Sequence, residues 1–210
     1  MNRIEKQIAF IMEIDKLKDV YRRSYLLSQS RNENSAEHCW HVSMMALILS
    51  EHANLNVNLS RVVEMLLVHD IVEIDAGDTF CYDEGGNLDK NKREQEAANR
   101  IFSILPEDQS DRLMKLWREY ENADTPEAKF AIALDRLMPL LHNLGTSGKS
   151  WRENGITKNQ VIERNEKIGN GSYALWEYAK QNILKAVENG ILKDDAESGS
   201  SHCPEGADFF

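Results

Sequence analysis

The stretch VVEMLLVHDIVEIDAGD, residues 62–78, decides the fold and holds a histidine, an aspartate and a glutamate within five residues, at 69, 70 and 73. Its apolar residues recur at helical spacing and predict a helix over 58–74. That helix carries His69 and Asp70 side by side, so an imidazole and a carboxylate leave it together. The pair alone is weak support for a site, because the histidine and aspartate content of the chain nearly explains one such pair by chance. A site at this pair therefore needs further side chains from other parts of the chain.

Helical patterns extend through most of the chain, and no stretch alternates convincingly with a period of two. A polar, glycine-containing segment, DAGDTFCYDEGGN at 75–87, is the longest irregular stretch in the body of the chain. The sequence therefore predicts an all-α fold, a single helical bundle. The expected helices span 3–20, 35–53, 58–74, 88–104, 107–122, 125–144, 157–168 and 172–189.

Several helix ends carry recognisable signals. Asn34 with Glu37 three residues later resembles a capping box, in which each residue satisfies a backbone N–H of the other. Thr125 followed by Pro126 is typical of a helix start, and Gly145 is suited to end that helix. These signals fix the helices at 35–53 and 125–144, which carry further candidate site residues.

The chain of 210 residues is long enough for one domain with a sizeable core. We expect that domain to cover 1–193, and a polar, flexible tail to cover 194–210. Three cysteines are too few and too scattered for a disulfide framework. With no leader and no apolar run near 18 residues, we expect a cytoplasmic protein without membrane association.

A net charge of −10 argues against binding to a nucleic-acid polymer, which favours a basic surface. It does not exclude a small anionic substrate, because a metal ion and one or two arginines can dominate the field around a site.

Two further residues are suited to join His69 and Asp70. His38 lies in AEHCWH at the start of a predicted helix, and Asp135 interrupts the apolar run FAIALDRLMPLL. Asp135 is therefore expected to face the interior, where an unpaired carboxylate is costly without a cation. Arg136 is the alternative cation for Asp135, although the side chains of adjacent residues in a helix point in different directions. His41 lies one turn after His38 and competes for the ligand role, since spacing alone cannot choose between them.

Two histidines and two aspartates would give a mixed nitrogen and oxygen donor set. That set suits one divalent transition metal (Mn, Co, Zn, Fe or Ni) rather than calcium or magnesium. Such an ion lowers the pKa of bound water and polarises a phosphoryl oxygen. The pattern thus favours metal-assisted hydrolysis.

Glu73 follows Asp70 by three residues and lies on the same helical face, where a general acid or base could stand. The alternative is a solvated glutamate at a helix end. Asp78 begins the long loop and could contact a substrate hydroxyl, although an ordinary turn aspartate is nearly as good an interpretation. We expect the remaining histidines to be structural or on the surface: His52, His142 and His202.

With these residues in place, the chain resembles the HD-domain metal-dependent phosphohydrolases, and most closely the branch that includes the bacterial 5′-deoxynucleotidases. The matching segments are RNENSAEHCWHVSMMA, LLVHDIVEIDAGD and ALDRLMPLL, in that order, and the likeness covers roughly 10–185. The resemblance implies that the metal ligands are His38, His69, Asp70 and Asp135. It also implies that Glu73 is the acid or base and that Asp78 lies near the substrate sugar.

By the same resemblance, Arg23 in VYRRSYLL is the arginine that holds the phosphate. A tryptophan follows that arginine in the bacterial nucleotidases and crowds the ribose 2′ position, whereas this chain has Ser24 there. Arg22 and Arg23 are adjacent, so the correspondence can slip by one residue. We therefore expect a weaker preference for deoxyribose than the bacterial enzymes have.

The resemblance implies a 5′-nucleotidase that removes phosphate from (deoxy)nucleoside 5′-monophosphates, and a homodimer. One alternative is a phosphodiesterase or pyrophosphohydrolase that acts on another nucleotide. A guanosine tetraphosphate hydrolase would carry an acidic pair after the His-Asp motif, where this chain has Glu73 and Ile74. The other alternative is a non-catalytic helical binding protein with a relict metal site.

Overall fold

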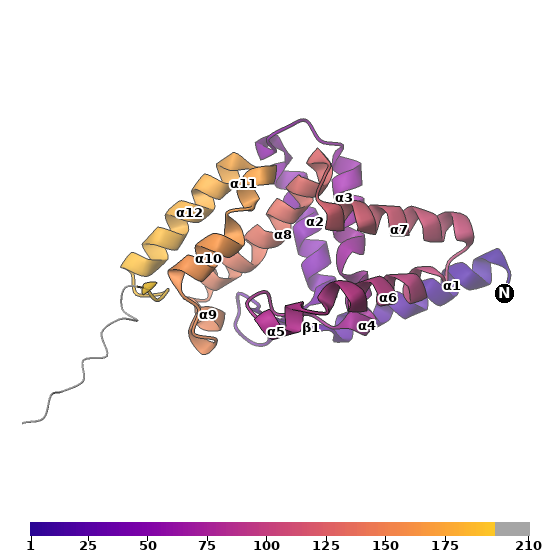
Figure 1. The fold of residues 1–210 in the computed structure, drawn as a ribbon, viewed down its shortest axis with the longest axis horizontal. Coiled ribbons are helices and arrows are strands. Elements are labelled where there is room, and N and C mark those ends of the chain that lie inside the picture. The colour runs from indigo at the N-terminus through magenta and orange to yellow at the C-terminus, as the bar shows by residue number, and fades with distance from the viewer. Residues whose placement is uncertain (196–210) are drawn as a thin grey trace, which may run out of the picture.

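The computed structural model describes residues 1–195, and the fold is helical apart from one short strand pair (Figure 1). The predicted all-α class is confirmed. The helices are α1 Arg3–Ile14, α2 Ser35–Leu49, α3 Leu59–Val68, α4 Glu73–Ala76, α5 Glu84–Asn87, α6 Lys90–Phe102, α7 Glu107–Asn122, α8 Pro126–Gly145, α9 Lys149–Glu153, α10 Lys158–Asn165, α11 Ile168–Gly171 and α12 Tyr173–Glu188. Short 3-10 helices lie at η1 Asp15–Asp19, η2 Ser50–His52 and η3 His69–Val72.

Two apolar cores hold the helices together. The larger core joins α2, α3, α8 and α12 through residues such as Val42, Leu66, Leu134 and Ile183. The second joins α1, η3, α6 and α7 around Phe10, Val72, Phe102 and Trp117. In Figure 1, α2, α3 and α8 occupy the middle, with α9–α12 to one side and α1, α6 and α7 to the other. Helix α2 and the α3–η3 segment contribute buried residues to both cores.

The capping signals are confirmed. Asn34 accepts a hydrogen bond from the backbone N–H of Glu37, and the Glu37 carboxylate accepts one from the Asn34 N–H. Thr125 caps α8 by accepting from the N–H of Ala128. The start of α2 is therefore fixed by its own sequence, and His38 lies in its first turn or just after it.

A pair of short antiparallel strands departs from the sequence expectation. Strand β1, Tyr21–Tyr25, pairs with β2, Asn32–Asn34, with Tyr21 opposite Asn34. The segment YRRSY is polar and lacks an alternating apolar face, so no periodic signal announces it. Residues 26–31 connect the two strands, and their pairing brings Arg22 beside the residues that precede α2.

The helix expected over 58–74 is interrupted after Val68, where the 3-10 turn η3 precedes α4. The Nδ1 atom of His69 lies 2.9 Å from the carbonyl oxygen of Leu66. A continuing α-helix would give that oxygen to the backbone N–H of Asp70. The His69 side chain therefore competes with the helix ladder at the point where the helix changes geometry.

Within residues 1–195, no helix combines the length and the apolar character that crossing a bilayer requires. Cys39 and Cys81 are free thiols. The flexible tail expected over 194–210 falls almost entirely outside the described residues, and so do His202 and Cys203.

Candidate metal centre

The four side chains that the family resemblance implies as metal ligands lie close together in the structure. The Nε2 atom of His38 lies 2.9 Å from Oδ1 of Asp135 and 3.8 Å from Oδ2 of Asp70. The Nε2 atom of His69 lies 3.2 Å from Oδ1 of Asp70 and 3.7 Å from Oδ1 of Asp135. His38 from α2, His69 from η3 and Asp135 from α8 each offer a ligand atom within 4.8 Å of the other two, and Asp70 lies against both imidazoles.

These residues fit a divalent transition metal. Both histidines are buried, and Nε2 of His69 has no hydrogen-bond partner although it points into the group of carboxylates. A buried ring nitrogen without a partner is costly, and a metal ion would satisfy it. The Nδ1 contact of His69 with the Leu66 carbonyl leaves Nε2 as the free donor atom, an arrangement typical of histidine ligands.

Electrostatic coupling within the group is strong. Burial lowers the pKa of His69, but the negative charge of Asp70 and the contacts with Cys39 and Asp135 together outweigh burial and leave that pKa well above its usual range. Burial raises the pKa of Asp135, yet the neighbouring imidazoles of His38 and His69 hold it well below its usual range. Tyr120 donates a hydrogen bond of 3.0 Å to Oδ2 of Asp135 and orients it. The ionised carboxylate is the form that binds a cation.

Glu73 is buried beside the metal centre, with 6% of its surface exposed, so it is not the solvated helix-end glutamate of the alternative reading. The hydroxyl of Ser35 donates a 2.6 Å hydrogen bond to Oε2 of Glu73. Burial raises the pKa of Glu73 to about 8, with the charge of Asp70 adding to the rise and that of Arg22 opposing it. Without a metal ion, Glu73 therefore keeps its proton to a higher pH than an exposed glutamate does.

Arg22, rather than Arg23, contacts the acidic residues. Its Nη1 atom donates a 2.8 Å hydrogen bond to Oδ2 of Asp70 and lies 4.0 Å from Oδ1 of Asp78. Arg23 is exposed, although both arginines line the pocket above the metal centre. The role that the family pattern gives to Arg23 stays a prediction, and Arg22 is the better placed of the two.

The pocket above the metal centre combines acidic, cationic and aromatic walls. Asp70, Glu73, Asp78 and Asp135 line it together with Ser24. Its cationic residues are Arg22, Arg23, Lys90, Arg136 and Arg164, and its aromatic residues are Phe80, Tyr82 and Trp151. Sequence reasoning singled out the loop at 75–87 but missed its aromatic pair, and it missed Lys90 and Arg164, which lie far from the motifs. No periodic signal marks such residues.

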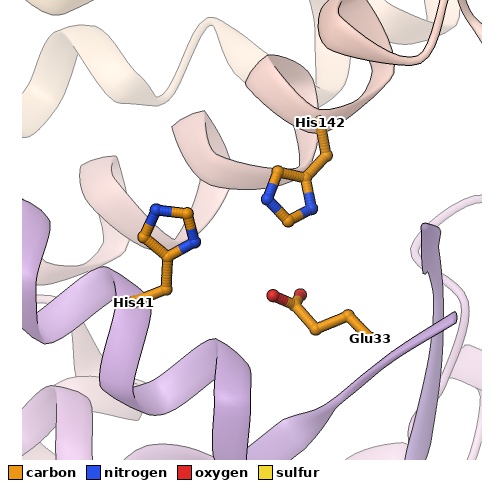
Figure 2. Close-up of side chains that lie close together, drawn as sticks. All are labelled: Glu33, His41 and His142. Carbon is orange, nitrogen blue, oxygen red and sulfur yellow. The ribbon is translucent and has the colours of Figure 1, made fainter. Parts of the chain in front are cut away.

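His41, the competitor of His38, does not join this group. Its ring lies beside that of His142, with 5.6 Å between the ring centres, and both lie near Glu33 (Figure 2). The Nδ1 atom of His38 faces this second group, 3.7 Å from Oε2 of Glu33. The two sides of the His38 ring therefore meet two different sets of side chains.

Comparison with known proteins places the fold. The family model of the HD domain matches residues 14–176. A solved structure from Magnetospirillum magnetotacticum, described as a predicted metal-dependent phosphohydrolase, is 48% identical with a TM-score of 0.88 over 91% of this chain and 96% of that one. An HD-domain phosphohydrolase from Listeria innocua shares the fold alone, at 19% identity and a TM-score of 0.58 over 88% and 87% of the two chains.

The human protein 5′-deoxynucleotidase HDDC2 is 33% identical to the chain over 135 residues, which are 64% of this chain and 65% of that protein. The match thus spans a little under two thirds of the human relative. The HD model, in contrast, covers well over half of this chain and includes the three segments that carry the donor residues. The protein belongs to the HD domain family.

Proposed function

We propose that the protein is a metal-dependent phosphohydrolase that removes phosphate from (deoxy)nucleoside 5′-monophosphates. The observation that carries this proposal is that His38 and His69 lie against Asp70 and Asp135, two carboxylates that line a pocket together with Arg22 and Glu73. The name of the human relative, a 5′-deoxynucleotidase, supports the substrate class.

When bound to the four donors, a divalent transition metal supplies an activated water and polarises the phosphoryl group. Arg22 is placed to pair with the phosphate charge, because its guanidinium already reaches the carboxylate of Asp70. Glu73, with its pKa raised to about 8, can hold a proton at neutral pH and release it to the leaving 5′ oxygen. Ser35 keeps the Glu73 carboxyl in place.

The sugar and base are proposed to lie along the rest of the pocket. Asp78 could accept a hydrogen bond from a sugar hydroxyl, and Ser24 lines the same wall. The aromatic rings of Phe80, Tyr82 and Trp151 offer stacking surfaces that every base can use. Loose base selectivity follows, because stacking does not read the hydrogen-bonding edges of a base.

One observation favours a second candidate, a phosphodiesterase or pyrophosphohydrolase acting on a larger nucleotide. Arg136 and Arg164 line the same pocket, and Nε of Arg136 is buried without a hydrogen-bond partner. Burial lowers the pKa of Arg136, and the charge of Arg164 lowers it further. Two neighbouring cations of this kind suit a substrate with a second anionic group.

A substrate screen separates the two candidates. The purified protein is supplied with Mn²⁺, Co²⁺ or Zn²⁺ and given nucleoside 5′-monophosphates, nucleoside 3′,5′-bisphosphates and dinucleotides, and the nucleoside, nucleotide and phosphate products are separated and quantified by chromatography. We expect the highest kcat/KM with 5′-monophosphates. Turnover of only the larger substrates would favour the second candidate, and no turnover of any of them, with metal bound, would leave the non-catalytic alternative.

Sugar selectivity is tested at Ser24. We expect a smaller ratio of kcat/KM for matched deoxy and ribo substrates than the bacterial nucleotidases have, and we expect Ser24→Trp to raise it. A strong deoxy preference that the tryptophan leaves unchanged would show that another residue sets the discrimination.

We also propose that the protein is a homodimer in the cytoplasm. Helix α2 exposes an apolar face at helical spacing, with Trp40 64% and Ile48 68% exposed and Met44 and Leu47 between them. An apolar helix face of this kind suits a second subunit. Sedimentation at a mass near one 24.1 kDa chain would contradict the dimer. The free thiols of Cys39 and Cys81 suit a reducing compartment, which cell fractionation can test.

A further inference from the structure

A second group of metal-binding side chains lies behind the His38 ring, away from the pocket. Glu33 comes from strand β2, His41 from helix α2 and His142 from helix α8. Figure 2 shows both imidazoles and the carboxylate pointing toward one common space between their three elements. None of the three residues lines the pocket above the metal centre.

These side chains lack the partners that buried polar groups need. Glu33 is 1% exposed and His142 is 4% exposed. Oε2 of Glu33 and Nδ1 of His142 have no hydrogen-bond partner, and within residues 1–195 the His41 ring makes ring contacts but no hydrogen bond. A buried polar atom without a hydrogen-bond partner lowers the stability of the fold by roughly 1–3 kcal/mol. Several such atoms close together therefore indicate that a ligand binds them.

The spacing of the donor atoms suits a metal ion. One ligand atom from each of Glu33, His41 and His142 lies within 4.8 Å of the other two, and the trio His38, His69 and Asp135 meets the same limit. Zinc binds imidazole nitrogen and carboxylate oxygen at about 2.0–2.2 Å, so donors around one ion lie roughly 3–4 Å apart. Small side-chain rotations would bring the second trio to that distance.

Charge also favours a cation here. Glu33 shares its nearest arginine, because Nε of Arg22 is 3.9 Å from its Oε2 while Nη1 of Arg22 donates a 2.8 Å hydrogen bond to Asp70. Burial lowers the pKa of His142, an effect that the negative charge of Glu33 opposes and that His41 strengthens. His142 is therefore a neutral imidazole at neutral pH, which is the form that binds metal.

We propose that Glu33, His41 and His142 bind a second divalent transition-metal ion, with zinc as the best match to two imidazoles and one carboxylate. The site is structural, since it shares no ligand with the first centre and does not open into the pocket. The ion ties β2, α2 and α8 together. It also fixes the Glu33 carboxylate behind Nδ1 of His38, and so helps to orient that ring toward the first centre.

Metal counting tests the proposal without any substrate, so its outcome is independent of the proposed activity. The protein is stripped, equilibrated with excess Zn²⁺, desalted and analysed by mass spectrometry for bound zinc. We expect His142→Leu to hold one ion fewer per chain than the native protein, and Asp70→Ala also to hold one fewer. The combined variant should hold two fewer. His202 and Cys203 are present in every sample, so any zinc they bind cancels in the differences.

Matched variants guard against misfolding. His41→Ala removes a half-buried ligand rather than a buried one, and we expect the same loss of one ion with an unchanged helical circular dichroism spectrum. His52→Gln, a change at an exposed histidine, should lose none. When Co²⁺ replaces Zn²⁺, the native protein should show two sets of visible absorption bands, and His41→Ala should show one set. Equal metal content in native protein, His142→Leu and His41→Ala would overturn the second site.

Discussion

The two faces of the His38 imidazole meet similar donor atoms in different surroundings. On the Nε2 side, His69, Asp70 and Asp135 lie beneath a pocket with arginines and a carboxyl group that can exchange a proton near neutral pH. On the Nδ1 side, Glu33 and His142 are buried and do not line that pocket. The donor atoms on either side of the His38 ring suit a metal ion. The Nε2 side also has access for a substrate and a nearby group that can carry a proton, and these two features allow catalysis there.

The largest effect is expected from Asp70→Ala. The change removes a carboxylate shared by the metal group and by Arg22, so we expect phosphate release to fall to background and the first ion to be lost. The Glu33 side should keep its ion, because Asp70 is not among its donors. Bound zinc and initial rates measure both effects.

Asp75→Ala is the matched control, since Asp75 is an exposed acid five residues later that pairs with Arg100. We expect it to keep metal and turnover. Normal activity in Asp70→Ala would remove the assignment of the Nε2 side as a metal centre.

Glu73→Gln should separate metal binding from proton transfer. It keeps the size of the side chain and can still accept from Ser35, but it cannot carry a proton. We expect unchanged metal content and a loss on the order of 10²–10⁴ in kcat, the usual worth of general acid–base catalysis. A fully active variant would make Glu73 structural and move the search for the proton path to Asp78.

Local signals in the sequence account for much of this site. The cap at Asn34 and the polar interruption at Asp135 each have a physical cause within a few residues, and both appear where expected. The break after Val68 coincides with the Nδ1 contact of His69, which helical periodicity does not encode. The pairing of β1 with β2 joins two short polar strands that carry no periodic signal, and the position of His142 against Glu33 depends on segments far apart in the chain. Such contacts exist only once the fold has formed.

The choice between Arg22 and Arg23 illustrates the same limit, because spacing alone cannot tell adjacent residues apart. Arg22→Ala should lower kcat/KM by roughly 10–100-fold, as expected for the loss of one charge-assisted interaction of about 1.5–3 kcal/mol. Arg23→Ala should have a smaller effect, since Arg23 is exposed. Steady-state kinetics on one 5′-monophosphate measures the effect of each variant. A larger loss of kcat/KM in Arg23→Ala than in Arg22→Ala would show that Arg23 holds the phosphate, as the family pattern implies.

The smallest expected effect is on the stability of the metal-free protein. Folding raises the pKa of Glu73 from 4.5 to about 8, so the folded state holds its proton more tightly than the unfolded state does. The associated stability is complete below pH 4.5 and is lost as the pH rises through 8. In the presence of a chelator, Tm should therefore fall more between pH 6 and 9 in the native protein than in Glu73→Gln. Each kcal/mol corresponds to about 2–4 °C for a domain of this size. Parallel Tm curves for the two proteins would show that Glu73 is ionised in the fold, and that the proton carrier on the Nε2 side is another group.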